Sequence, residues 1–247
     1  MNRELQEAKK LARRIARIAG PPIFYQEKKL EVEGSRRLFR SSPLVNECLN
    51  LVRKKEGSIG HGIVHVQKVA IDAGAISLVE NSLVHKKSEV RRVVLLAHVA
   101  GVLHDIRRLE KNHARASADE AGILLSQFDL PKREIEAVTG AIGNHEAFQP
   151  AALLADPLAR FLSDALYDAD KFRWGPDNFT DMMWDMVEYR KASLDAVLKR
   201  FLKGMEGIEL IRETFRTVTG KAYGPDFIDR GIKIGMKFYT IMLQSKV

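Results

Sequence analysis

The sequence predicts an all-α fold. Apolar residues recur at the three- and four-residue spacing of amphipathic helices through most of the 247 residues. Ser, Asp or Pro stands before several of these segments, as is typical of residues that begin helices. The sequence contains no series of alternating strands separated by turns. With 45% hydrophobic residues the chain can bury a core, and its length is close to the upper limit for a single one.

The N-terminal part begins with a predicted basic helix over residues 1–19, which Gly20-Pro21-Pro22 ends. In the next segment Leu30-Glu31-Val32-Glu33 alternates and Gly34-Ser35 favours a turn, so we expect a small hairpin there. Further helices are predicted from Ser42-Pro43 to residue 55, over 63–80 after a loop at 57–62, and from Ser88 to residue 103. The helix over 88–103 is apolar on nearly all sides, which predicts a central, buried position.

The C-terminal part is predicted to be helical throughout. Two similar triplets, Gly175-Pro176-Asp177 and Gly224-Pro225-Asp226, are typical of a helix end followed by a new helix start. The predicted helices cover residues 114–128, 131–145, 150–168, 177–203, 206–219 and 226–244.

The positive charge is concentrated at the N-terminus. The chain has 40 Lys and Arg against 32 Asp and Glu, and residues 1–40 carry six of the eight net positive charges. For residues 1–19 we favour packing against the domain with a solvated basic face over nucleic-acid or membrane contact. The single Cys48 excludes an internal disulfide, and the longest apolar run, Val93 to Leu103, is too short to span a bilayer. The N-terminal residues are charged from Arg3 onward and lack the apolar core expected of a signal peptide. A cytoplasmic protein is therefore expected.

All seven histidines lie between residues 61 and 145. His104-Asp105 follows the apolar helix, His65 precedes it by 39 residues, and Asp170 follows Asp105 by 65 residues on a later helix. Imidazole and carboxylate together suit Mn, Fe, Co, Ni or Zn, with Mg as a further option.

At this point the sequence resembles the HD-domain superfamily of metal-dependent phosphohydrolases. The matching segments are Gly60-His61-Gly62-Ile63-Val64-His65, Ala100-Gly101-Val102-Leu103-His104-Asp105, Ala141-Ile142-Gly143-Asn144-His145 and Asp168-Ala169-Asp170-Lys171. They span about residues 60–175, less than half of the chain. The resemblance implies an HD-domain-like helical bundle with extra N- and C-terminal helices. The expected divisions are 1–57 as a basic segment packing on the domain, 58–175 as the metal-binding core, and 176–247 as an extension of the same domain.

The resemblance implies that His65, His104, Asp105 and Asp170 bind one metal ion. His61 competes with His65 for the first position and otherwise contacts substrate or solvent. Some members of the superfamily bind a second ion through extra histidines, here His113 and His145, although one ion is expected rather than two. His85 and His98 are more typical of structural or solvated positions.

The activity that the resemblance implies is hydrolysis of a phosphate ester, with a nucleotide as the expected small-molecule partner, by metal-activated water. Lys171 resembles the superfamily lysine that reaches substrate phosphate, and Arg107 and Arg108 are further candidates. His145, Glu146 and Asp168 are alternatives for proton transfer.

Departures from the family pattern leave the substrate open. Arg108 stands at or near the position of a glutamate common in superfamily nucleotidases, and the Gly-Tyr-Pro signature of cyclic-dinucleotide hydrolases is absent. The alternatives are a regulatory or binding module with little catalysis, and a di-iron relative that activates oxygen. Aromatic residues between Phe172 and Trp184 form part of the core or wall a base-binding pocket.

Overall fold

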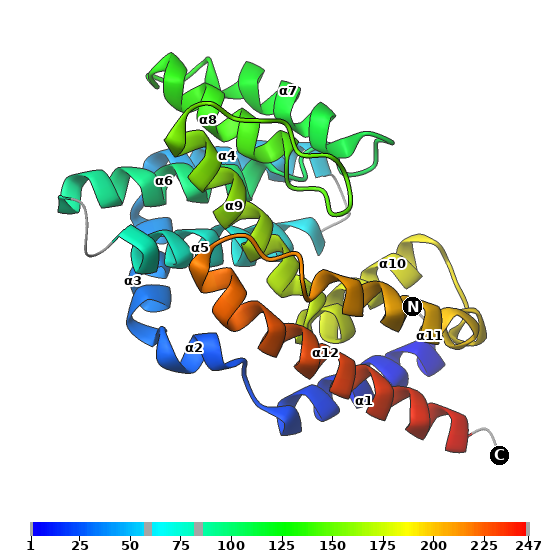
Figure 1. Ribbon diagram of the computed structural model, residues 1–247. Helices are drawn as coiled ribbons and strands as arrows, with labels where there is room; N and C mark the ends of the chain where they lie inside the picture. The colour runs from blue at the N-terminus through cyan, green and yellow to red at the C-terminus, as the bar shows by residue number, and fades with distance from the viewer. Residues whose placement is uncertain (1, 57–60, 82–85, 246–247) are drawn as a thin grey trace. The chain divides into compact units, whose positions relative to one another are not determined.

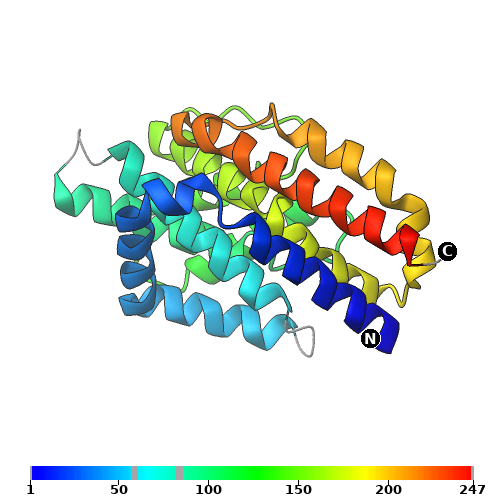
Figure 2. The same cartoon turned by 90° about the horizontal axis from the view of Figure 1, so that it is seen from below.

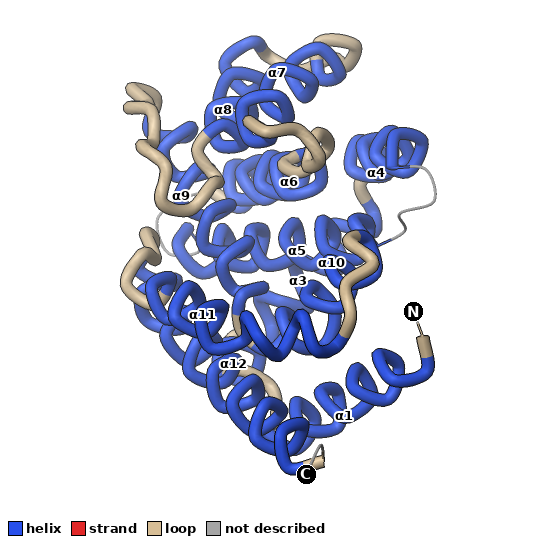
Figure 3. Tube along the Cα trace, turned by 90° about the vertical axis from the view of Figure 1, so that its right-hand side faces the viewer, coloured by secondary structure: helices blue, strands red, loops and turns tan. Residues whose placement is uncertain are grey.

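Figure 1 shows the computed structural model, which describes residues 2–56, 61–81 and 86–245. In these ranges the chain forms helices and loops and no strand, so the prediction of an all-α fold is confirmed (Figure 3). The chain divides into two compact units. We call Met1–Gln26, Lys171–Thr214 and Ala222–Val247 the terminal unit, and Glu27–Asp170 with Phe215–Lys221 the central unit. Each is described by itself.

The central unit is built around one helix, α6 (Lys87–Leu103). Helix α6 packs against five other helices of this unit, and ten of its residues are buried. The predicted central position of this helix is confirmed. The helices of the unit are α3 (Lys29–Ser41), α4 (Pro43–Glu56), α5 (His61–Asn81), α6, α7 (His113–Leu125), α8 (Lys132–Gly143) and α9 (Pro157–Lys171).

Helices α5 and α6 lie side by side and approach closely at one glycine (Figure 1). A Cβ atom built on Gly101 would lie 2.5 Å from the Cα of Ala70, which is shorter than any normal contact. Only glycine allows this approach, because it has no side chain to separate the backbones. The contact lies one turn or so from His65 on α5 and from His104 at the end of α6, so it brings these two rings within reach of each other.

The predicted hairpin near residue 34 is wrong, because the segment is part of α3. Val32, Ser35 and Phe39 are buried at helical spacing. The hydroxyl of Ser35 donates to the carbonyl oxygen of Ile71 at 2.7 Å and lies 2.8 Å from Nε2 of His98. Burial of one helical face against α5 therefore outweighs the short alternation and the turn preference of Gly34-Ser35.

Among the residues that the structure describes, one helix, Gly62–Asn81 within α5, is long and apolar enough to cross a membrane. Half of this segment is buried inside the protein. That is weak evidence for a membrane span, since the core helix of a soluble protein has the same composition.

The terminal unit contains α1 (Arg3–Ala19), α2 (Ile23–Glu27), a 3₁₀ turn (Phe172–Trp174), a π-helix (Asn178–Met182), α10 (Met183–Tyr189), α11 (Leu194–Ile211) and α12 (Val218–Gln244). Helices α2 and α12 begin or end in the central unit. Helix α1 begins at the side-chain cap of Asn2 and ends at Gly20, whose φ of 73° lies in the left-handed region. The predicted first helix and its end are confirmed.

Helix α1 packs against the π-helix through Leu5, Ala8 and Ala12. Two of its basic side chains form ion pairs in this unit, Lys9 with Asp185 at 3.6 Å and Arg13 with Asp181 at 2.8 Å. Part of the N-terminal positive charge is therefore balanced by carboxylates of the same unit.

Several C-terminal helix boundaries differ from those predicted. The predicted helix over 150–168 begins only at Pro157, and the segments predicted at 177–203 and 206–219 are replaced by α10, α11 and the start of α12. Pro225 lies inside α12 instead of opening a helix. A proline inside a helix costs about 3 kcal/mol. Contacts beyond it hold the helix together, because Asp226 accepts from the backbone N–H of Ile23 at 2.8 Å and also binds Arg230.

The aromatic residues of the terminal unit form a core. Phe172, Phe179 and Trp184 are fully buried, so the alternative of a base-binding wall is not supported. Phe172 stacks on Phe227 with ring centroids 4.1 Å apart, and Phe24 packs on both. Helices α11 and α12 run beside each other (Figure 2), where Phe201 stacks on Tyr239.

Candidate metal centre

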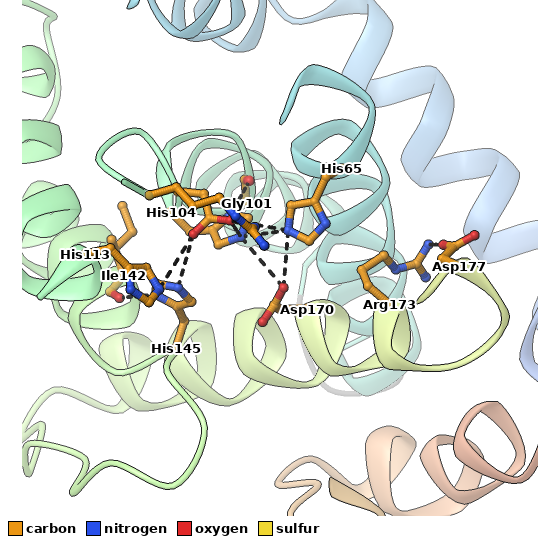
Figure 4. Close-up of polar contacts among 11 residues, drawn as sticks. His65, Gly101, His104, His113, Ile142, His145, Asp170, Arg173 and Asp177 are labelled. Carbon is orange, nitrogen blue, oxygen red and sulfur yellow. Dashed lines mark hydrogen bonds and ion pairs between the residues drawn. The ribbon is translucent and has the colours of Figure 1, made fainter. Parts of the chain in front are cut away.

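A cluster of histidine and aspartate side chains lies buried in the central unit (Figure 4). Helix α5 supplies His65, the residues after α6 supply His104 and Asp105, and the last turn of α9 supplies Asp170. These side chains come from three helices that are separated in the chain. Buried imidazole and carboxylate groups gathered in this way could hold a metal ion.

The distances within the cluster match those between ligands of a single ion. Nε2 of His65 lies 3.2 Å from Nε2 of His104 and 3.3 Å from Oδ1 of Asp170. Oδ2 of Asp105 lies 3.6 Å from His65 and 3.5 Å from His104. Metal–ligand bonds of about 2.1 Å in a tetrahedral site place ligand atoms about 3.4 Å apart. His65, His104 and Asp170 could therefore hold one ion, with Asp105 beside them, and we call these four residues the four-donor group.

Two further histidines lie on the other side of Asp105. Its Oδ1 atom lies 3.6 Å from Nε2 of His145 and 3.8 Å from Nε2 of His113. The rings of His104 and His145 are 5.0 Å apart, and those of His113 and His145 are 5.1 Å apart. Asp105 thus presents one oxygen to the four-donor group and the other to His113 and His145, which we call the second donor group.

Backbone carbonyls orient two of the histidine rings. Nδ1 of His104 donates to the carbonyl oxygen of Gly101 at 2.8 Å, and Nδ1 of His145 donates to that of Ile142 at 2.7 Å. Because the Nδ1 atom carries the proton, the lone pair of Nε2 faces the cluster, as a metal ligand requires. Nδ1 of His65 is buried and has no hydrogen-bond partner among the residues that the structure describes.

The protonation of these groups also suits a cation. Burial lowers the pKa of His104 to about 4, so its ring is neutral at neutral pH. Burial acts to raise the pKa of Asp105, but His104, Arg108 and His145 outweigh it and hold the pKa well below its ordinary value. Burial lowers the pKa of His113, whereas the Asp105 carboxylate raises that of His145 against the effect of burial. His104 and Asp105 are therefore in the forms that bind metal, a neutral imidazole beside an ionised carboxylate, whereas the raised pKa of His145 favours its protonated ring.

The predicted phosphate-binding arginines have different surroundings. Arg108 forms an ion pair with Oδ2 of Asp105 and is half exposed, so its guanidinium lies at the edge of the centre. Arg107 pairs with Glu110 and lies 3.9 Å from Glu120, and its contacts among the described residues are to these carboxylates. The structure therefore brings Arg108 to the centre and directs Arg107 to another acidic pair.

Other predicted residues lie around the centre or next to its ligands in the chain. Oε2 of Glu146 lies 3.9 Å from Nδ1 of His113. Lys171 ends α9 directly after Asp170 and is buried. His61 is the first residue of α5, so the prediction that it lies in a loop is wrong. The side chain of His61 and the whole of His85 lie outside the described residues. His98 is buried away from the cluster, where it contacts Ser35 and Phe39.

Asp168 anchors the start of α12 within the central unit. Its carboxylate accepts from the backbone N–H groups of Arg216 and Thr217 at 2.8 Å and from the Thr217 hydroxyl at 2.7 Å. Burial raises the pKa of Asp168 to about 6 against the effect of these hydrogen bonds. Both carboxylate oxygens of Asp168 accept hydrogen bonds, so its role in the structure is to hold this segment. That role differs from the proton transfer predicted from the sequence.

Arg216 connects this anchor to the loop that carries His145. Its guanidinium lies 3.6 Å from the centroid of the Tyr167 ring, and its Nη1 donates to the carbonyl oxygen of Asn144 at 3.3 Å. The side chain of Asn144 in turn exchanges two hydrogen bonds with the backbone of Ala152. Sequence analysis missed Arg216, because nothing local connects it to a site that lies more than 40 residues earlier in the chain.

Comparison with protein-family models, with curated proteins and with solved structures finds no match to this chain. The structure therefore defines an all-α protein with a buried histidine and aspartate cluster that could hold a metal ion.

Proposed function

We propose that this chain is a metal-dependent phosphohydrolase of the HD-domain type, which hydrolyses a phosphate ester, with a nucleotide as the expected substrate. The observation that carries the proposal is the four-donor group. Its members are the residues that the sequence resemblance selects as ligands, and the Nε2 atoms of His65 and His104 lie 3.2–3.8 Å from each other and from the carboxylate oxygens. Mn, Fe, Co, Ni and Zn are the ions that this donor set suits best.

A divalent ion in such a site lowers the pKa of water and polarises a phosphoryl oxygen. The chain supplies the remaining functions. Asp105 and Asp170 provide the negative charge that holds a cation, and the hydrogen bonds at Nδ1 of His104 and His145 keep Nε2 of each ring directed at the centre. Arg108, beside Asp105, can bind a phosphoryl oxygen as negative charge develops on it.

Proton transfer to the leaving group needs an acid near the centre that also reaches solvent. Glu146 meets both conditions, because its carboxylate is partly exposed and lies 3.9 Å from His113. Nε2 of His145, beside Asp105, is the alternative position for a proton. Lys171 remains the proposed contact of the substrate phosphate, on the basis of the resemblance.

The second donor group favours one alternative function. His113, His145 and Oδ1 of Asp105 offer nitrogen and oxygen donors next to the four-donor group. Two iron ions held in this way are typical of relatives that activate oxygen. A stoichiometry of one ion per chain would exclude this alternative, whereas two iron ions with oxygen consumption would favour it.

The test compares two substitutions on the same helical segment. The wild type, His104→Gln and a control, His98→Gln, are freed of metal with a chelator, reloaded with each ion, and assayed on nucleotides and simple phosphate esters. We expect His104→Gln to lose bound metal and to lower kcat/KM by at least about 10³-fold, or about 4 kcal/mol. His98→Gln should keep both, since His98 is buried outside the cluster. Wild-type protein that binds metal but hydrolyses no ester would refute the proposal and favour a binding module.

A further inference from the structure

One carboxylate oxygen of the candidate metal centre is shared between the four-donor group and an arginine. Oδ2 of Asp105 lies 3.6 Å from Nε2 of His65 and 3.5 Å from Nε2 of His104. The same Oδ2 atom accepts a hydrogen bond from Nη1 of Arg108, with which it forms an ion pair. A cation in the four-donor group and the guanidinium of Arg108 therefore depend on the same oxygen.

Arg108 reaches Asp105 from a position that solvent can enter. The two residues lie three apart in the turns that follow α6, where the backbone N–H of Arg108 donates to the carbonyl oxygen of Asp105 at 2.9 Å. The side chain of Asp105 is 7% exposed, whereas that of Arg108 is 48% exposed. The turn holds the backbone of Arg108 in place, and its guanidinium remains accessible to an anion from solution.

The shared oxygen sets two positive charges against each other. Charges a few ångströms apart interact strongly in a partly buried site, because protein screens them less than water does. One carboxylate cannot neutralise both a divalent ion and a guanidinium, so we expect Arg108 to weaken the binding of the ion. The neighbouring Arg107 differs, because it pairs with Glu110 and lies 3.9 Å from Glu120.

A phosphate group bound to Arg108 would remove this repulsion. A guanidinium carries five N–H donors in a planar arrangement that matches two oxygens of a phosphate. Such charge-assisted pairs are strong, and the negative charge of the phosphate would compensate that of Arg108. Because linkage is reciprocal, the ion would tighten the binding of phosphate by the same factor as phosphate tightens the binding of the ion.

From these observations we propose that Arg108 couples the binding of a phosphate group to the binding of the metal ion at the four-donor group. Arg108 weakens the binding of the ion when it pairs with Asp105 alone, and it ceases to do so when it also binds phosphate. This inference rests on the metal centre of the proposed function and describes the regulation of that same site. The ion is held most tightly when a phosphate ester is present.

The experiment measures the binding of Mn²⁺ by calorimetry, so it requires no hydrolysis. Wild type, Arg108→Gln and Arg107→Gln are treated with a chelator and titrated with Mn²⁺, without and with saturating inorganic phosphate. The two substitutions remove the same charge from adjacent positions, but Arg108 pairs with Asp105 and Arg107 with Glu110. The amount of Mn²⁺ that phosphate binds in solution is the same for all three chains.

Without phosphate, we expect Arg108→Gln to bind Mn²⁺ about tenfold more tightly than the wild type. Arg107→Gln should bind it as the wild type does. With phosphate, the affinity of the wild type should rise to that of Arg108→Gln. Damage to the fold would weaken the binding of the ion, so the tighter binding expected of Arg108→Gln cannot result from misfolding.

Two results would overturn the inference even if the chain hydrolyses phosphate esters. One is an affinity for Mn²⁺ that Arg108→Gln leaves unchanged or lowers, and the other is a tenfold difference that persists in phosphate. The expected affinities without hydrolysis of any ester would support the coupling and refute the proposed function. A wild type that binds none of Mn, Fe, Co, Ni and Zn would refute both.

Discussion

The two units differ in the side chains that they bury. The central unit buries His104, Asp105, His145 and Asp170 close together, whereas the terminal unit buries a group of aromatic rings around Phe227. Burial of ionisable groups opposes folding unless each is paired, while burial of aromatic rings favours it and adds specific ring contacts. The terminal unit therefore derives its stability from its own packing, and we expect that of the central unit to depend on a bound cation.

The largest effect is expected when the aromatic core is cut. Phe227 is 1% exposed and contacts three rings, so Phe227→Ala should lower the free energy of unfolding by about 4 kcal/mol. Urea unfolding followed by circular dichroism measures the change. The control is Leu210→Ala on α11 of the same unit, at a site that is 64% exposed, where we expect a change within about 0.5 kcal/mol. If the two substitutions had equal effects, the aromatic core would not be the main source of stability in the terminal unit.

A somewhat smaller effect should follow from adding metal. An ion that binds only the folded chain stabilises it by about 2.7 kcal/mol at about 100 times its dissociation constant. Mn²⁺ or Zn²⁺ added to the chelated protein should therefore raise its unfolding temperature. Phe227→Ala should retain this rise and Asp170→Asn should lose it, because only Asp170 belongs to the four-donor group. A rise of equal size in Asp170→Asn would place the bound ion elsewhere.

The smallest effect concerns His98, which is buried in the central unit outside the cluster. The Ser35 hydroxyl donates to Ile71, so it accepts from Nε2–H of His98, and Nδ1 of His98 is left without a partner. Protonation at Nδ1 would place a charge in the core, and burial accordingly lowers the pKa of His98 from 6.5 to about 3. The unfolded chain then binds a proton that the folded chain does not, so stability falls as the pH falls below 6.5.

The size of this effect can be isolated by substitution. Between about pH 7.5 and about pH 5, His98 should account for a loss of about 2 kcal/mol in the free energy of unfolding. His98→Gln keeps a donor for Ser35 and has no titrating group, so its pH dependence should be weaker by that amount. Urea unfolding at the two pH values measures the difference. Identical pH dependence in both proteins would show that His98 takes up a proton in the same pH range in the folded chain as in the unfolded chain.

The helical class, the central position of α6 and the residue types of the candidate centre could all be predicted from the sequence. These are consequences of local periodicity and of which side chains the chain contains, so they need no knowledge of distant contacts. The segment around Gly34 and the helix through Pro225 could not be predicted in the same way. In both, packing of a buried face overrides a local preference for a turn or a helix end.

The way in which the donors are shared could not be predicted, because it depends on how the helices pack. Spacing in the sequence predicts that His65, His104 and Asp170 lie on three separate helices. It does not predict that one oxygen of Asp105 faces His65 and His104 while the other faces His113 and His145. The contact of Arg216 with Asn144 was equally hidden. These features depend on how closely the helices approach one another, as at Gly101 and Ala70. The volumes of side chains that are far apart in the sequence together determine that approach.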